Sequence, residues 1–293
     1  MYNILVTGAN GQLGLEIQNI VNRMDAENLK NVNYFFTSKN TLDITDKDSI
    51  AKFVNNNKIN IIINTAAYTL VDNAETNLIN ANKVNNLAVG YLAEIAQENG
   101  IKLIHVSTDY VYDGNSNKPY AESDLTNPKN NYGRTKLDGE NALRVINPKN
   151  SIIIRTSWVY SSFGKNFVNT ILHLAGKNNE LRIIYDQIGS PTYARDLAQV
   201  VLSIMFKIAC ENVEIYHYSN DGISSWYDFA YEIIKFTKLD CSLIPINSRE
   251  YKQTAKRPLY TVISKDKIKQ TFGVDIPHWK DSLEDCLKQY KRI

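Results

Sequence analysis

The chain has 293 residues, of which 43% are hydrophobic and 22% are charged. This is ordinary globular composition and excludes a mainly disordered protein. The formal net charge of +2 is too small for a protein that binds nucleic acid through its overall charge. The N-terminus lacks a basic segment followed by an apolar stretch, and the three cysteines are widely spaced. We therefore expect a soluble cytoplasmic protein with reduced thiols and without nucleic-acid or membrane partners.

Short apolar runs alternate with longer helical patterns through the first half of the chain. The runs predict strands at residues 3–7, 34–37, 58–64 and 101–107. The helical patterns cover residues 12–23, 46–57 and 80–99. Such alternation indicates βαβ units with right-handed crossovers. The expected fold class is therefore α/β, with a Rossmann-type doubly wound parallel sheet.

The second half of the chain is less regular. Residues 158–165 have loop-like composition, residues 195–210 have a helical pattern, and the tail over 245–277 carries three of the seven prolines. We expect a larger domain over residues 1–155 and a smaller C-terminal α/β substrate lobe over residues 156–293. Residues from about 195 to 218 are expected to return to the first domain, so that the two interleave.

A glycine-rich segment, GANGQLG, follows the first predicted strand and opens the first predicted helix. Gly8 allows a tight turn, Gly11 allows the backbone to approach a pyrophosphate, and Gly14 allows close packing of helix on sheet. Backbone N–H groups and the helix dipole then hold the phosphates. The segment predicts a dinucleotide site, and the alternative is a tight turn without a ligand.

The GxxGxxG spacing resembles the short-chain dehydrogenase/reductase superfamily. An acidic residue after the second strand would favour NAD over NADP, because it binds the ribose 2′-hydroxyl and repels a 2′-phosphate. This chain has Thr37, Ser38 and Lys39 there instead. We therefore expect NADPH to be accepted as well as NADH, unless Lys39 is only a solvated loop charge.

Two further segments are candidates for contact with the cofactor. Asp43 and Ile44 can cover the adenine. Small residues after the third strand let a cofactor lie across the sheet, in the run Thr65, Ala66, Ala67 and Tyr68.

The predicted catalytic residues lie on the fourth strand and on a helix that follows it. Thr108 stands at the strand end, and Tyr132 and Lys136 are four positions apart, so that they share one helical face. A tyrosine has an unperturbed pKa of about 10 and needs help to exchange protons at neutral pH. We expect the Lys136 ammonium to lower the pKa of Tyr132 and to bind the nicotinamide ribose, while the Thr108 hydroxyl donates to the substrate oxygen.

Seven segments follow one another along the chain: GANGQLG, NTAAYTLVDNAE, STDYVYDG, YGRTK, RTSWVYSSFGKNF, DQIGSPTYARDLA and KRP. In these segments and their order the chain resembles the dTDP-4-dehydrorhamnose reductases over almost its whole length. STDYV and YxxxK also match nucleotide-sugar epimerases and dehydratases, whereas RTSWVY with DQIGSPT is more specific to the reductases.

The resemblance implies an NAD(P)H-dependent reductase of the 4-keto group of dTDP-6-deoxy-L-lyxo-4-hexulose, which yields dTDP-L-rhamnose for polysaccharide synthesis. It places a hydroxyl/tyrosine/lysine catalytic set on Thr108, Tyr132 and Lys136. It implies cofactor contacts at Gly11, Gln12, Leu13, Asp43, Ile44, Ala66, Ala67, Tyr68, Tyr132 and Lys136. It implies an NAD(P)-binding first domain and a nucleotide-sugar-binding second lobe.

The substrate residues implied by the resemblance are Thr108, Asp109 and Trp158. An indole face also suits stacking on a sugar or thymine, although Trp158 can equally pack the lobe. Arg257, in the KRP segment, is a candidate for a bidentate contact with the diphosphate, and the alternative is a solvated charge.

Some members of the family form dimers around a magnesium ion held by acidic side chains. Glu16 matches one such position, but Arg195 stands where a second acidic residue is expected. We therefore expect no metal, a monomer or a metal-independent homodimer, and a surface position for Glu16. The four histidines have no metal-ligand spacing and are expected to be ordinary core or surface residues.

Two other functions stay open from the sequence. One is a different nucleotide-sugar reductase or epimerase of the same superfamily. The other is a non-catalytic regulatory subunit of the methionine adenosyltransferase type, which has this fold. The hydroxyl, tyrosine and lysine set argues against a pure binding protein, because binding alone requires no acid at the nicotinamide.

Overall fold

A six-stranded sheet forms the centre of the protein. The structure, a computed structural model, describes residues 1–27 and 29–290. All neighbouring strands of this sheet pair in parallel. In spatial order they are β10 (Glu214–Tyr218), β5 (Ile152–Thr156), β4 (Lys102–Thr108), β3 (Ile61–Asn64), β1 (Tyr2–Thr7) and β2 (Val32–Thr37). The predicted Rossmann-type sheet is confirmed.

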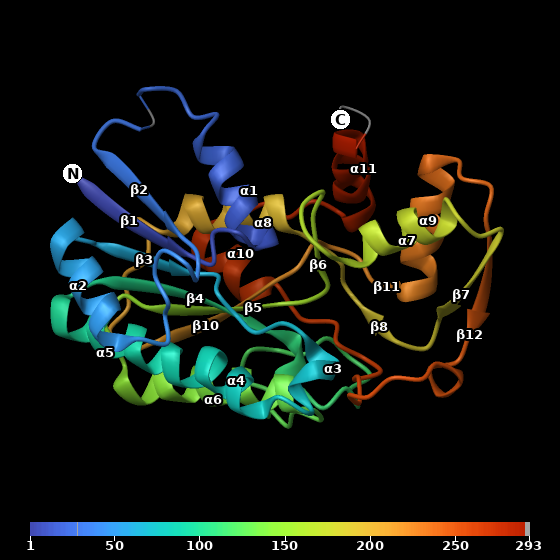
Figure 1. The fold of residues 1–293 in the computed structure, drawn as a ribbon, viewed down its shortest axis with the longest axis horizontal. Coiled ribbons are helices and arrows are strands. Elements are labelled where there is room, and N and C mark those ends of the chain that lie inside the picture. The colour runs from blue at the N-terminus through green and yellow to red at the C-terminus, as the bar shows by residue number, and fades with distance from the viewer. Residues whose placement is uncertain (28, 291–293) are drawn as a thin grey trace.

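Helices cover both faces of the sheet (Figure 1). One face carries α1 (Gln12–Val21), α8 (Ala194–Ile204) and α10 (Asp266–Phe272). The other carries α2 (Lys47–Asn57), α5 (Ala88–Asn99) and α6 (Asn131–Ile146). Alternate strand residues supply the two cores: Ile4 and Val6 pack on the first face, and Leu5 packs on the second. The strands are therefore buried on both sides, as an apolar strand in a parallel sheet must be.

The second lobe has a hydrophobic core of its own. Its helices are α7 (Phe167–Ala175), α9 (Trp226–Thr237) and α11 (Trp279–Tyr290), and its longer strands are β7 (Glu180–Ile184) and β12 (Ser242–Ile246). Its short strands are β6 (Val159–Tyr160), β9 (Thr192–Tyr193), β8 (Ile188–Gly189) and β11 (Ser224–Ser225). Figure 1 shows α7, α9, β7 and β12 beyond the carboxyl ends of the six central strands. This arrangement places a second layer of side chains opposite the edge where Rossmann sheets bind ligands.

Short helical segments connect these parts. They are α3 (Val71–Ala74), α4 (Leu78–Asn82), a π-helix (Lys83–Leu87) and two 3₁₀ helices (Asp109–Val111 and Ser248–Glu250). In the described part of the chain, no helix is both long enough and apolar enough to cross a membrane.

Three local predictions are wrong. The helix expected over 80–99 is interrupted by the π-helix, where the Asn85 carbonyl approaches Gly139 of α6 so closely that a side chain at Gly139 would collide with it. The loop expected over 158–165 begins with strand β6, which pairs with β9. The helix expected over 195–210 ends at Ile204. The π-helix and strand β6 depend on contacts with distant segments, which a local sequence pattern does not reveal.

Candidate functional site

Several predicted site residues follow the carboxyl ends of central strands. The chain leaves β1 toward β2 on one side and later returns to place β3 on the other side. Rossmann-type sheets bind ligands at such a switch point. Gly8 follows β1, Ala66 follows β3, and Thr108 ends β4. Residues far apart in the sequence therefore meet at one edge.

The glycine turn has the geometry of a phosphate-binding turn. Gly8 has a φ of +69°, and a Cβ there would lie 2.6 Å from the Ala66 nitrogen. A Cβ at Gly14 would lie 2.5 Å from the Gly8 carbonyl oxygen, so helix and turn are in contact. Among the described residues, the only atom near a Cβ at Gly11 is that same oxygen, at 3.2 Å. Gly11 is also the N-cap of α1, and no side chain in the described part of the chain caps the helix there. The open side of Gly11 and the uncapped N–H groups fit a pyrophosphate.

Other predicted cofactor residues are held by the protein itself. The side chains of Leu13 and Ile44 lie in the two hydrophobic cores. The Asp43 carboxylate accepts hydrogen bonds from the Thr45 N–H (2.9 Å) and hydroxyl (2.8 Å). The Gln12 side chain accepts from the Asn166 amide at 2.9 Å and thereby joins α1 to the second lobe. A cofactor contact at Leu13 or Ile44 would therefore use the backbone.

Asn85 is a site residue that the sequence analysis missed. Its side chain accepts from the Tyr68 N–H (2.8 Å) and donates to the Tyr68 carbonyl (3.1 Å) and the Thr135 hydroxyl (3.2 Å). It lies in the π-helix, a conformation often found at functional sites. Asn85 thus fixes the segment after β3 against helix α6. No sequence spacing marks a π-helix, so nothing in the chain distinguished this asparagine.

The fold brings Thr108 and Tyr132 together. Thr108 is buried at the end of β4, where its hydroxyl accepts from the Tyr110 N–H at 3.2 Å. Tyr132 lies in the first turn of α6, which is capped by Asn130 through the Gly133 N–H at 2.8 Å. Thr108 lies close enough to Tyr132 to lower the pKa of its phenol. Both hydroxyls of the predicted catalytic set therefore lie at one point.

The predicted lowering of the Tyr132 pKa is wrong for this structure. Burial raises the pKa of Tyr132 to about 12, although Thr108 acts in the opposite direction. The Lys136 nitrogen lies 2.7 Å from the Val106 carbonyl oxygen and 3.3 Å from the His105 Nε2. Lys136 is only 1% exposed, and burial lowers its pKa to about 8. Tyr132 therefore keeps its proton at neutral pH, which suits an acid.

Asp109 is a buried carboxyl group next to Thr108. Burial raises its pKa to about 7, against hydrogen bonds from Thr261 and Thr108 that lower it. Within the described residues, the Asp109 Oδ2 has no hydrogen-bond partner. A buried polar atom without a partner is costly, so a ligand hydroxyl that donates to this oxygen would be bound favourably.

Trp158 packs against another tryptophan of the second lobe. Its indole is stacked on Trp226, with ring centroids 3.5 Å apart and an interplanar angle of 6°. A Cβ at Gly189 would lie 2.7 Å from the Trp158 ring. One indole face is therefore covered by the protein, and the substrate role of Trp158 stays a prediction.

Arg257 has a carboxylate partner in the structure. Its guanidinium donates to Asp72, over 3.0 Å from Nη1 and 2.6 Å from Nη2. Asp72 also accepts from the N–H groups of Thr254 and Ala255 at 3.1 and 2.9 Å. The neighbouring Lys256 carbonyl accepts from Asn130, the cap of α6, at 2.8 Å. The contact with a diphosphate stays a prediction, and it would require Arg257 to share or leave Asp72.

The expected surface position of Glu16 is wrong. The Glu16 side chain is 0% exposed, because α1 packs against α8 and the second lobe. Its carboxylate lies 3.2 Å from the Arg195 Nε and accepts from the Ser161 hydroxyl at 2.6 Å. The guanidinium that replaces the expected second acidic residue thus neutralises Glu16 directly.

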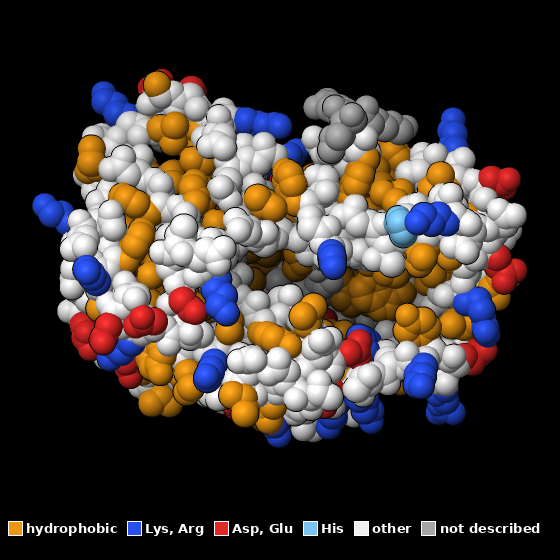
Figure 2. Space-filling model, viewed as in Figure 1, with side chains coloured by type: hydrophobic (Ala, Val, Ile, Leu, Met, Phe, Trp, Pro, Cys, Tyr) orange, Lys and Arg blue, Asp and Glu red, His pale blue; other side chains and the backbone are white. Residues whose placement is uncertain are grey.

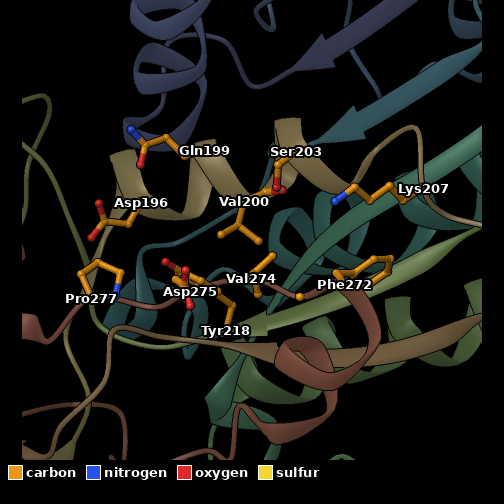
Figure 3. A pocket seen from close by; sticks show the side chains of 11 residues that line it. Asp196, Gln199, Val200, Ser203, Lys207, Tyr218, Phe272, Val274, Asp275 and Pro277 are labelled. Carbon is orange, nitrogen blue, oxygen red and sulfur yellow. The ribbon is translucent and has the colours of Figure 1, made fainter.

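Figure 2 shows that this face of the molecule is hollowed between the six-stranded sheet and the second lobe, with hydrophobic side chains around the hollow. A different cavity of about 300 Å³ lies between α8, β10 and the segment after α10 (Figure 3). Asp196 and Lys207 stand at opposite ends of it. None of the predicted site residues lines this cavity, so it is separate from the candidate site.

Two curated proteins are similar to this chain over nearly its full length. The chain is 39% identical to the spore coat polysaccharide biosynthesis protein SpsK of Bacillus subtilis, over 99% of this chain and 98% of that protein. It is 40% identical to a dTDP-4-dehydrorhamnose reductase of Aggregatibacter actinomycetemcomitans, over 97% of this chain and 98% of that protein.

A solved structure agrees with these relatives. A dTDP-4-dehydrorhamnose reductase of Bacillus anthracis, in complex with NADP, superposes with a TM-score of 0.91 at 32% identity, over 99% of this chain and 100% of that one. The family model described as "RmlD substrate binding domain" matches residues 2–292. The match spans both the glycine turn and the second lobe, and the chain belongs to the RmlD substrate binding domain family.

Proposed function

We propose that this protein catalyses the NAD(P)H-dependent reduction of the 4-keto group of dTDP-6-deoxy-L-lyxo-4-hexulose to dTDP-L-rhamnose, the final step of dTDP-rhamnose biosynthesis. The observation that carries the proposal is the position of Thr108 at the end of β4 beside Tyr132 in the first turn of α6, where Thr108 lowers the pKa of Tyr132. Relatives named dTDP-4-dehydrorhamnose reductase over nearly the full chain support it.

The cofactor is NADPH or NADH. The open side of Gly11 and the uncapped start of α1 fit its pyrophosphate. When bound, it supplies the hydride that reduces the sugar carbonyl carbon. The proposed contacts are Gly8, Gly11, Gln12, Leu13, Gly14, Asp43, Ile44, Ala66, Ala67, Tyr68, Tyr132 and Lys136. Lys39 is exposed after β2, where a cation favours a 2′-phosphate.

Tyr132 acts as the acid of the proposed reaction. As the carbonyl carbon gains a hydride, its oxygen gains an electron pair and takes the phenolic proton. Burial keeps that proton on Tyr132 until it is needed. The Thr108 hydroxyl, which donates to the Asp109 Oδ1 at 3.1 Å in this structure, turns to donate to the same oxygen when substrate binds. Lys136 orients the cofactor ribose. Holding these groups in place before the reaction is the protein's main contribution to the rate.

The second lobe binds the dTDP-sugar in this proposal. Asp109 and Thr108 contact the sugar, Trp158 lines its site, and Arg257 contacts the diphosphate. We propose the division expected above: an NAD(P)-binding domain over residues 1–155, to which about 195–218 return, and a nucleotide-sugar lobe over 156–293. β10 and α8 lie on the central sheet, which supports the interleaving.

The protein is proposed to act in the cytoplasm as a monomer or as a dimer without a bridging metal. The contact of Arg195 with Glu16 supports the absence of a bridging metal, because Arg195 neutralises the carboxylate that such a metal would need.

The test is the loss of NAD(P)H absorbance with enzymatically generated dTDP-6-deoxy-L-lyxo-4-hexulose, with the product identified by mass spectrometry and NMR. We expect cofactor-dependent formation of dTDP-L-rhamnose. Turnover only with another nucleotide sugar would favour the alternative reductase or epimerase. Cofactor binding without turnover on any sugar nucleotide would favour the regulatory subunit.

A further inference from the structure

A row of buried polar side chains runs beneath the predicted catalytic residues, from β3 to α6. Asn64 ends β3, His105 lies in β4, and Lys136 lies in α6; all three are buried. The Asn64 amide nitrogen is 3.0 Å from the His105 Nδ1, and the Lys136 nitrogen is 3.3 Å from the His105 Nε2. Polar groups buried this completely satisfy one another's hydrogen bonds. Their donors and acceptors therefore determine where the protons are.

The orientation of the Asn64 amide follows from its other neighbours. The Asn64 Oδ1 is 3.2 Å from the Ala66 nitrogen and 2.6 Å from the Thr7 hydroxyl. A backbone N–H only donates, so the amide oxygen must face Ala66. The amide NH₂ group consequently faces His105 and donates to its Nδ1. Since Nδ1 accepts, the imidazole proton is on Nε2.

This tautomer determines what Lys136 does at the other side of the ring. Burial holds the pKa of His105 well below its usual value, so the ring is neutral and carries one N–H. That N–H points from Nε2 to the Lys136 nitrogen. An ammonium group has no lone pair and cannot accept, whereas a neutral amine accepts from His105 and still donates to the Val106 carbonyl at 2.7 Å.

We propose that His105 is a positioning residue: Asn64 fixes it as the Nε2–H tautomer, and its N–H stabilises the neutral amine form of Lys136. Lys136 then gains and loses a proton near neutral pH instead of staying a permanent cation beside Tyr132. The pKa of about 8 that burial gives Lys136 agrees with this.

The other charged groups around Lys136 are accounted for. Glu140, one turn further along α6, favours the charged lysine. Its carboxylate is bound by the Arg155 guanidinium of β5 at 2.7 Å and by the Ser107 hydroxyl. That pair is internally neutralised, and both forms of Lys136 can donate to the Val106 carbonyl of β4. The His105 N–H is the contact from β4 that only the neutral amine can accept.

The first test is the tautomer of His105 in the cofactor-free protein. Long-range ¹H–¹⁵N correlation spectra of histidine-labelled protein distinguish Nε2–H, Nδ1–H and imidazolium, and the signal lost in His105→Gln identifies the residue. We expect the Nε2–H tautomer. An Nδ1–H tautomer or an imidazolium would overturn the proposal. This measurement requires no turnover, so it is independent of the proposed reductase function.

The second test inverts the tautomer with Asn64→Asp. A carboxylate only accepts, so it draws the proton to Nδ1, and Nε2 then accepts from the Lys136 ammonium. In the proposed reductase the ammonium is the active form. We therefore expect the alkaline midpoint of the kcat profile to move up by about one pH unit, a tenfold change in proton affinity.

A purely structural role would lower kcat at every pH and leave the midpoint in place, and that result would overturn the proposal. The control is His173→Gln, at an exposed position in α7, which we expect to change neither the His105 signal nor the midpoint. If Asn64→Asp does not fold, the tautomer of His105 measured in the wild-type protein tests the proposal by itself.

Discussion

Substitution of Gly14 by alanine is predicted to lower both stability and cofactor binding, whereas substitution of Gly11 by alanine is predicted to lower mainly cofactor binding. At Gly14 the new Cβ would lie 2.5 Å from the Gly8 oxygen and 2.7 Å from the Ala9 Cα. A carbon–oxygen contact needs about 3.3 Å, so the turn must move by about 0.8 Å. Overpacking costs about 1–3 kcal/mol, and the gain in helix propensity offsets about 1 kcal/mol. We expect Gly14→Ala to lose about 0–2 kcal/mol of stability and to bind cofactor weakly.

At Gly11 the new Cβ meets the Gly8 oxygen, at 3.2 Å, and no other atom of the described residues. The stability cost is then the N-cap preference for glycine, about 1 kcal/mol or less. The methyl group stands where the pyrophosphate would approach. One lost hydrogen bond to a charged group costs about 1.5–3 kcal/mol, or about 10–150-fold in affinity. Gly11→Ala should therefore fold normally and bind NADPH poorly.

The control is Gly90→Ala in α5, whose new Cβ would meet only the Ala142 Cβ, at 3.8 Å. It should gain about 0.5–1 kcal/mol without any change in NADPH affinity. Chemical denaturation measures the free energy of unfolding of each variant, and fluorescence titration measures its affinity for NADPH. Wild-type NADPH affinity in Gly11→Ala would refute the assignment of the turn.

Three further predictions concern charged residues. Lys39→Ala should weaken NADPH binding more than NADH binding, and equal effects in the two titrations would make Lys39 a bystander. Arg257 lowers the pKa of Asp72 from 3.8 to about 2. The stabilisation by the Asp72 carboxylate is therefore present above pH 3.8 and is lost as the pH falls toward 2. Asp72→Asn should make the free energy of unfolding depend less on pH in that range. An identical acid profile in the variant would contradict this. Glu140→Gln should lower the free energy of unfolding by about 3–5 kcal/mol, because it leaves the buried Arg155 without its counter-charge. The control, Glu94→Gln, breaks an exposed pair with Lys47 and should lower the free energy of unfolding by less than about 1 kcal/mol.

The sequence predicted those features that depend on short-range patterns. The apolar strands 3–7 and 101–107 are found within one residue of their expected ends, because a strand buried on both faces must be apolar throughout. The glycine turn was predictable because each glycine of the motif stands at a spacing where a side chain would interfere with the turn, the phosphate or the helix packing.

Features that depend on long-range contacts could not be predicted. Glu16 is buried because Arg195 and Ser161, from distant segments, supply its partners. Lys136 turns to His105 and Val106 because the end of β4 presents both to α6. A spacing of four residues shows that Tyr132 and Lys136 share a helical face, but it does not show which strand residues that face will meet.

The most direct test of the proposed catalytic site is turnover of Tyr132→Phe with dTDP-6-deoxy-L-lyxo-4-hexulose and NADPH. This change removes only the phenolic oxygen, which holds the proton that the proposed acid donates. We predict that kcat falls by about 10²–10⁴-fold while NADPH affinity and thermal stability stay close to wild type. Formation of dTDP-L-rhamnose by the variant at the wild-type rate would contradict the role of Tyr132 as the acid.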